Sequence, residues 1–482
     1  MLTLLLIAIP LFMAGAIFLM GARMARQLAL AGGIAELLVA IFAMYLLKTG
    51  DTGQLLSFQQ DWIGPLGISY GFRMDGISAV MVLLASLLLP IIVYASFNRT
   101  YKNPHVFYGL MMLMIASMIG AFTTTDGFMF YIFYEFALVP IYFIILIWSN
   151  FEYKARITLK FFLYTLFGSL FMLISLLYIY QQSKSFAMED LYAAGQAMNG
   201  IEQGWLFAGF FVAFAVKIPV FPFHTWQPST YDAAPTPATM LLAGIMLKMA
   251  SYGLIRLVLP MLPVGVAEYG TWAIVLAAIS VLYASGMAIA QKRYKLLIAY
   301  SSIAHLGLLT AGILSGNAQG IQGGVFEMLS HGILAVGLFF VYDIIETRLQ
   351  HDDMHRMGGI REVNPLLAFL FFTIVMGSVA LPLTSGFVGE FLLLVGLNQY
   401  STTLAIVAGL TVILGAVYML RAFQSMMLGS TNFHTQNFAP LNSQEKTILA
   451  IIVTLVIALG IYPDPILSIS DPSIEKLLLG IH

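Results

Sequence analysis

The sequence has no cysteine among its 482 residues. It therefore has no disulfide, no thiolate to hold an iron–sulfur cluster and no cysteine nucleophile. Charged residues are also scarce, at 9%, whereas 60% of the residues are hydrophobic. A soluble chain of this length cannot bury so much apolar surface, so the composition predicts a polytopic membrane protein. Apolar runs fill nearly the whole chain and leave no room for a large soluble domain or a nucleic-acid-binding patch.

Long apolar segments recur along the chain, and a membrane-spanning helix needs about 20 such residues. We therefore predict an all-α membrane protein of about fourteen transmembrane helices. The first segment lacks a basic start and is expected to be a retained helix rather than a cleaved signal. The predicted spans are Leu2–Met20, Leu28–Tyr45, Ile77–Tyr94, Val106–Phe122, Gly127–Trp148, Ile157–Tyr180, Trp205–Phe221, Ala238–Leu259, Trp272–Ala290, Leu296–Leu314, Ile321–Val341, Leu366–Leu394, Leu404–Leu420 and Ile448–Tyr462.

The basic residues are unevenly distributed between alternate loops. When Lys160 and Arg256, each within one turn of a span end, are counted with the adjoining loops, the 22 lysines and arginines divide unevenly. Fifteen fall in odd-numbered loops, five in even-numbered loops and tails, and two, Lys217 and Lys248, inside predicted spans. Lysine and arginine favour cytoplasmic loops. The bias supports the predicted helix count, and it places both termini on the side away from the cytoplasm.

Two predicted spans are interrupted. The seventh breaks at Pro219 and Pro222, and the twelfth breaks near Pro382 and Gly386. Broken helices at corresponding positions of two halves are typical of transporters built from inverted repeats. Because five spans separate the breaks, the two halves point in opposite directions. We expect N-terminal helices 1–3 in residues 1–105, repeat one in 106–260, repeat two in 261–430, and helix 14 with the tail in 431–482.

A charge at the centre of a bilayer costs about 2.5–3.5 kcal/mol, so ionisable groups inside spans usually mark a pathway. Glu135 lies among large aromatic residues in the fifth span, and Lys217 lies just before the first break. We expect these two to form an ion pair, because pairing offsets both desolvation costs. A static buried pair is the alternative to a functional one.

Lys248 is a second lysine near the centre of a predicted span, the eighth. Buried lysines can exchange protons, so Lys217 and Lys248 are candidate proton carriers if water fills the space between them. The alternative is that both reach a membrane surface or neutralise a nearby acid. Their depth in the predicted helices argues against the first of these.

Three further spans carry titratable groups. His305 and His331 lie in the tenth and eleventh spans, and Glu390 follows the second break. Histidine titrates near pH 6.5 and is a natural proton relay, although a lone membrane histidine is often only hydrogen-bonded structure. Glu327 precedes His331 by four residues, so the two share a helix face. Under the repeat hypothesis, Glu390 corresponds to the Lys217 region and is a terminal site.

Other polar groups have weaker signals. Glu36, in the second span beside small residues, is more simply explained by packing than by a partner. His224, after the first break, either gates proton entry or caps broken backbone. Histidines 351 and 355 with Asp352 and Asp353 resemble a metal cluster, but a solvated loop is the better interpretation, because nothing nearby in the sequence completes a coordination shell.

Several of these segments resemble the antiporter-like subunits of respiratory complex I and of multisubunit sodium/proton antiporters, most closely the M-type chains. The resemblance runs nearly end to end, although the loop Gln227–Asp232 departs from the pattern often seen in the group. The segments are Glu135-Phe-Ala-Leu-Val-Pro, Phe214-Ala-Val-Lys-Ile-Pro, His224-Thr-Trp, Leu242-Ala-Gly-Ile-Met-Leu-Lys248, Leu297-Ile-Ala-Tyr-Ser-Ser-Ile-Ala-His305 and Gly386-Phe-Val-Gly-Glu390-Phe.

The resemblance implies fourteen helices and two inverted five-helix repeats. It also implies a proton pathway through Glu135, Lys217, Lys248, His331 and Glu390, with His305 on the same route. The chain is then a non-redox subunit of a proton-translocating NADH:quinone oxidoreductase in a bacterial inner membrane. Flavin, iron–sulfur clusters and quinone belong to partner subunits, which include two sister chains, and this chain carries no cofactor. Alternatives are a sodium/proton antiporter subunit, a passive scaffold and a solitary carrier.

Overall fold

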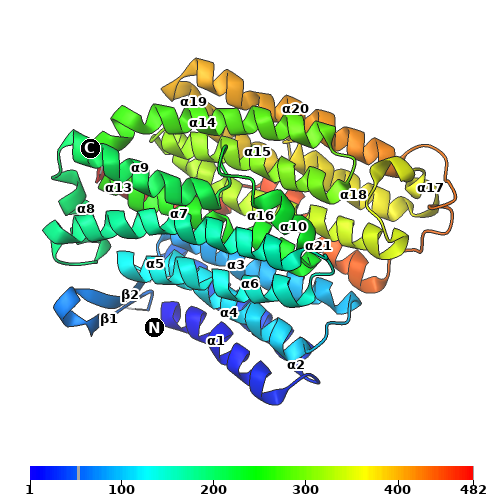
Figure 1. Ribbon diagram of the computed structural model, residues 1–482, viewed down its shortest axis with the longest axis horizontal. Coiled ribbons are helices and arrows are strands. Elements are labelled where there is room, and N and C mark those ends of the chain that lie inside the picture. The colour runs from blue at the N-terminus through cyan, green and yellow to red at the C-terminus, as the bar shows by residue number, and fades with distance from the viewer. Residues whose placement is uncertain (51–54, 481–482) are drawn as a thin grey trace.

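The computed structural model describes residues 1–50 and 55–480, and it is a bundle of long, roughly aligned helices (Figure 1). Residues 481 and 482, at the end of the predicted C-terminal part, lie outside the described residues. The first and last described residues lie at the same end of the bundle as a small β-hairpin. The first third of the chain forms α1 (Leu2–Met20), α2 (Ala25–Thr49), β1 (Ser57–Ile63), η1 (Gly64–Leu66), β2 (Ile68–Arg73), α3 (Gly76–Ala95), η2 (Ser96–Asn98), α4 (Pro104–Thr123), α5 (Gly127–Phe136) and α6 (Leu138–Trp148).

The middle of the chain continues the bundle through the first break. It comprises α7 (Lys154–Ser183), α8 (Met188–Gln196), α9 (Gly200–Lys217), α10 (Gln227–Ala233), α11 (Thr236–Leu241), the π-helical turn η3 (Leu242–Met246), α12 (Lys248–Gly253), the π-helical turn η4 (Leu254–Val258) and α13 (Leu259–Met261). The last part comprises α14 (Pro263–Ala290), α15 (Tyr294–Leu314), α16 (Ala318–Leu349), η5 (Met354–Arg356), α17 (Ile360–Val363), α18 (Pro365–Ser378), α19 (Ser385–Tyr400), α20 (Thr402–Met427), α21 (Ser443–Ile461) and α22 (Asp464–Leu479).

The helices agree with the predicted membrane spans. Twelve helical segments within the described residues are long and apolar enough to cross a membrane. The other two predicted spans coincide with α9 and with the α18–α19 pair, which are the two interrupted ones. The breaks therefore fall where the prolines place them. The total of fourteen crossings and the division into inverted repeats remain predictions.

The β-hairpin between α2 and α3 is a structural element that the all-α prediction lacked. β1 pairs antiparallel with β2, with Phe58 opposite Phe72 and Gln60 opposite Tyr70. The rings of Trp62 and Tyr70 stack at a centroid distance of 4.9 Å. The turn Gly64-Pro65-Leu66-Gly67 is rich in turn-forming residues, so the sequence did contain a hairpin signal.

Asp75 links the hairpin to the helical bundle. Its side chain caps α3 by accepting from Ser78 N at 3.1 Å, and Asp75 N donates to Ser78 Oγ at 2.8 Å. The same carboxylate forms an ion pair with Arg256 of η4. One residue therefore starts a helix and ties it to the eighth predicted span.

The centre of the bundle is α16. It packs against α3, α15, α19 and η3, and its membrane-spanning window is buried throughout. By contrast, α1, α2, α20 and α21 are only one-third buried over their windows and lie at the periphery. Ionisable groups in the middle of α16, Glu327 and His331, therefore lie inside protein rather than against lipid.

Candidate functional site: a buried chain of ionisable residues

Lys217 ends α9 at the first break and is almost completely buried, at 1% exposure. Its Nζ donates to the backbone oxygen of Tyr134 at 2.7 Å and lies 3.4 Å from the centroid of the Tyr134 ring. A cation over an aromatic face is stabilised by the ring quadrupole, most strongly where water is excluded. Tyr134 therefore holds the Lys217 ammonium through both its ring and its backbone.

The predicted ion pair between Glu135 and Lys217 is wrong as a direct contact. Neither the ion pairs nor the hydrogen bonds of the described residues join the two side chains, and Oε1 of Glu135 is buried without a partner. Consecutive residues of a helix point about 100° apart. Tyr134 occupies the position against Lys217, and Glu135 stands beside it.

A short irregularity separates Glu135 from the rest of its span. α5 ends at Phe136 and α6 begins at Leu138, so the fifth span is interrupted at Ala137. Pro140 explains the interruption, because proline has no N–H and its ring clashes with the carbonyl four residues earlier. Glu135 thus lies beside an irregularity, as Lys217 lies beside the first break.

Lys248 starts a short α-helical piece between two π-helical turns, η3 and η4. π-Turns are rare and often accompany functional sites. The Nζ atom of Lys248, which is completely buried, donates to the backbone oxygen of Ala243 in η3 at 2.5 Å. It also lies 2.8 Å from Nδ1 of His331 in α16. The sequence placed Lys248 within a span but did not predict the π-turns around it.

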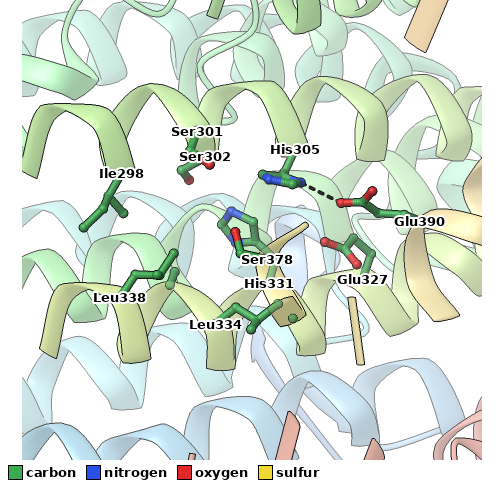
Figure 2. A pocket seen from close by; sticks show the side chains of 12 residues that line it. Ile298, Ser301, Ser302, His305, Glu327, His331, Leu334, Leu338, Ser378 and Glu390 are labelled. Carbon is green, nitrogen blue, oxygen red and sulfur yellow. Dashed lines mark hydrogen bonds and ion pairs between the residues drawn. The ribbon is translucent and has the colours of Figure 1, made fainter. Parts of the chain in front are cut away.

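His331, His305 and Glu390 continue this arrangement across three helices (Figure 2). The rings of His305 and His331 have centroids 6.1 Å apart. Nδ1 of His305, in α15, lies 2.7 Å from Oε1 of Glu390, in α19. All three side chains are at least nine-tenths buried. Together with Lys248, these residues therefore form a line of titratable side chains inside the bundle.

A cavity accompanies the two histidines. Its lining includes Ser301, Ser302 and Ser378 beside His305, His331 and Glu390. The space open to the centres of water molecules is about 20 Å³, enough for about one water molecule. Water there would bridge the rings of the two histidines, which form no direct hydrogen bond with each other in the described structure.

Glu327 lines the same cavity as His331, which agrees with the shared helix face that their four-residue spacing predicted. Ligand atoms of Glu327, His305 and Glu390 all lie within 4.8 Å of one another. Sequence reasoning missed Tyr134 and the cavity serines. The position of Tyr134 beside Glu135 was the only available signal for the first.

The remaining candidates lie outside this line. His224 is buried against the rings of Phe221 and Tyr283, at centroid distances of 5.7 and 4.8 Å, and within the described residues its side chain caps no backbone group. Glu36 is fully buried, with both carboxylate oxygens unpartnered, on a face where the neighbouring Gly33 packs against Pro90.

The loop with His351 and His355 does not form a metal cluster among the described residues. Asp352 instead accepts from Nε of Arg293 at 2.9 Å, and the His351 ring meets that of His434 edge-on at 5.3 Å. Arg293 also contacts both carboxylate oxygens of Asp232, at 2.7 and 2.8 Å. These contacts tie the segment after the first break to the loop that precedes α17.

The fold and the site together define an antiporter-like membrane protein, with two broken spans and a buried line of lysine, histidine and glutamate. The chain belongs to the NADH:quinone oxidoreductase/Mrp antiporter transmembrane family, whose model matches residues 124–416.

Individual relatives agree with this assignment. The chain is 39% identical to NADH-quinone oxidoreductase subunit M of Rickettsia typhi over 92% of this chain and 91% of that one. It is 35% identical to the subunit of the same name in Rhodobacter capsulatus, over 95% and 91% of the two chains. Its fold matches a chain of respiratory complex I from Thermus thermophilus with a TM-score of 0.89, at 29% identity and over 99% and 100% of the two chains.

Proposed function

We propose that this chain is the proton-translocating membrane-arm subunit of a respiratory NADH:quinone oxidoreductase. The supporting observation is the buried contact between Lys248 and His331 at 2.8 Å, together with that between His305 and Glu390 at 2.7 Å. Ionisable side chains cost free energy to place inside a membrane. A series of four such side chains in a row is best explained by proton conduction.

Each contact has a distinct task in the proposed pathway. Lys248 passes its proton to Nδ1 of His331, and the ring then releases a proton to water in the cavity. His305 takes up that proton and delivers it to Glu390. The carbonyl of Ala243 holds the Lys248 ammonium in place for the first step.

Lys217 and Glu135 supply the switch at the other end of the pathway. Tyr134 fixes the Lys217 ammonium, and the adjacent Glu135 carboxylate favours that charged form at longer range. Redox chemistry in partner subunits alters this local field, so Lys217 releases its proton toward Lys248. Moving one charge against 100 mV costs about 2.3 kcal/mol. A change in the electrostatic field at Lys217 can supply a free energy of this size.

In this assignment, the chain itself carries no redox group. Its partner subunits hold the flavin, the iron–sulfur clusters and the quinone, and two of them are sister antiporter-like chains. The chain ends and the β-hairpin face away from the cytoplasm, and the basic loops face it. The two breaks, after α9 and after α18, mark corresponding points of two inverted repeats.

Two experiments test this function. Purification of the chain from its native membrane should bring down flavin-containing and iron–sulfur subunits. If only other antiporter subunits accompany it, the sodium/proton antiporter function replaces the one proposed.

In inverted membrane vesicles, Lys217→Ala and Glu135→Gln should abolish NADH-driven proton uptake in an assembled complex. Unchanged uptake in both variants would instead make the chain a passive scaffold.

A further inference from the structure

We propose that His305, Glu327 and Glu390 form a binding site for one divalent transition-metal ion such as Zn²⁺. One ligand atom of each residue lies within 4.8 Å of the other two. The three side chains come from α15, α16 and α19, so the site joins three helices at the end of the cavity (Figure 2). An imidazole nitrogen with two carboxylate oxygens is a ligand set that zinc accepts.

The carboxylate oxygens at this site need a partner. Oε2 of Glu327 and Oε2 of Glu390 are both buried and make no hydrogen bond to any described residue. The side chains are only 2% and 3% exposed. The nearest lysine of the pathway, Lys248, is already engaged by Ala243 and His331. Two carboxylates in a low-dielectric interior need protons or a cation, and a dication satisfies both at once.

The cavity supplies the remaining coordination position. Zinc sites with three protein ligands keep a water molecule as the fourth ligand. The space of about 20 Å³ beside His305 has room for one. Metal–ligand distances of about 2.0–2.2 Å require the three side chains to draw together by roughly one ångström. The flexible glutamates can make this movement.

Zinc and protons compete for the same atoms. The carboxylates and the ligating nitrogen of His305 must be deprotonated to bind zinc, so binding releases protons and strengthens as pH rises. The metal site itself does not depend on the proposed function. The effect of the bound ion rests on the proposed function, because the ion would block the end of the proton pathway at Glu390.

The test uses the full-length chain in lipid nanodiscs and Zn²⁺ alone. Because the chain has no cysteine, no thiolate sulfur can bind zinc, and histidine is the source of high-affinity nitrogen ligands. We expect one tightly bound zinc, with X-ray absorption showing one imidazole nitrogen and oxygen neighbours at about 2.0–2.2 Å. Glu327→Gln should weaken binding more than the roughly 10–100-fold cost of losing an outer-shell partner.

The matched control is the double variant His351→Gln/His434→Gln, which removes a second close histidine pair of the described structure. It should retain the tight site. The proposal is overturned if the wild-type chain binds no zinc, if the control loses the ion, or if folded Glu327→Gln binds as tightly as wild type. Glu390→Gln is a second test should Glu327→Gln fail to fold, as judged by thermal unfolding.

A second readout separates the metal site from the proposed function. In vesicles containing the assembled complex, Zn²⁺ should slow NADH-driven proton uptake, more strongly at higher pH. Tight zinc binding at the triad without slower uptake would support the metal site and count against Glu390 as part of the pathway.

Discussion

Nζ of Lys248 and Nδ1 of His331 lie 2.8 Å apart, although 83 positions separate the two residues in the chain. The lysine lies between two π-helical turns, and the histidine lies on α16, whose membrane-spanning window is buried throughout. Because the π-turns interrupt regular α-helix on both sides of Lys248, they set the direction in which its side chain points. The contact therefore depends on how α12 and α16 pack.

Replacement of Lys248 tests the role of this contact. Lys248→Ala should lower NADH-driven proton uptake by about 100-fold, the lower end of what a positioned proton-transfer group contributes. Uptake is measured by a pH-sensitive dye in inverted vesicles, with assembly checked by native electrophoresis. Lys102→Ala is the control, because this exposed lysine contributes only its backbone oxygen to a hydrogen bond with Trp148. Equal uptake in the two variants would contradict the role of Lys248.

Tyr134 offers a test of the contact with Lys217. Tyr134→Phe keeps the ring over the ammonium and loses only the hydroxyl, which donates to Ala213 O at 3.3 Å. It should cost about 1 kcal/mol of stability. Tyr134→Leu also removes the ring and should cost about 2 kcal/mol more, the value of a desolvated cation–π contact. Thermal unfolding in detergent compares the two. Equal losses would show that the ring does not stabilise Lys217.

Asp75 should be important for stability rather than for transport. Asp75→Asn leaves the side-chain oxygen that caps α3 but removes the charge opposite Arg256, whose side chain is 15% exposed. Loss of one partner of a buried pair costs about 3–5 kcal/mol, and partial exposure places this case at the lower end. The control is Glu189→Gln, which breaks the exposed pair with Arg73 and should cost less than about 1 kcal/mol. Similar unfolding temperatures for the two variants would be inconsistent with this prediction.

Gly386 allows close packing at the second break. A Cβ there would lie 2.1 Å from the backbone oxygen of Gly377, at the end of α18. Gly386→Ala should therefore push α18 and α19 apart and cost about 1–3 kcal/mol. Gly409→Ala is the control in another helix, because its Cβ would meet only the Leu394 side chain at 3.5 Å or more. If thermal unfolding shows that both variants are as stable as wild type, α18 and α19 do not pack as closely as described.

The positions of the breaks could be predicted from the sequence because proline acts locally. Pro219, Pro222 and Pro382 interrupt helices through a missing N–H and a steric clash, whatever the surroundings. The burial of the lysines and histidines inside the spans could also be predicted from the sequence. They lie within apolar runs long enough to span a membrane, and such runs are stable only inside it.

The partner of Lys217 was not available from the sequence. The desolvation cost of two buried charges favoured Glu135 as the partner of Lys217. Successive side chains of a helix, however, point about 100° apart. Whether residue 134 or 135 faces the lysine depends on how α5 packs beside α9. The same limit applies to Glu327, whose carboxylate meets Glu390 only because α16 and α19 pack side by side.

The sequence by itself therefore determined that this is a membrane protein. It also determined where the apolar spans and the two breaks lie, and which charged residues lie inside the spans. These properties follow from hydrophobicity and backbone chemistry, which act over a few residues. Tertiary structure decided which charges meet: Lys217 with Tyr134, Lys248 with His331, and His305 with Glu390. Such contacts depend on helix rotation and packing between segments far apart in the chain, and the local pattern of residues does not specify those distances.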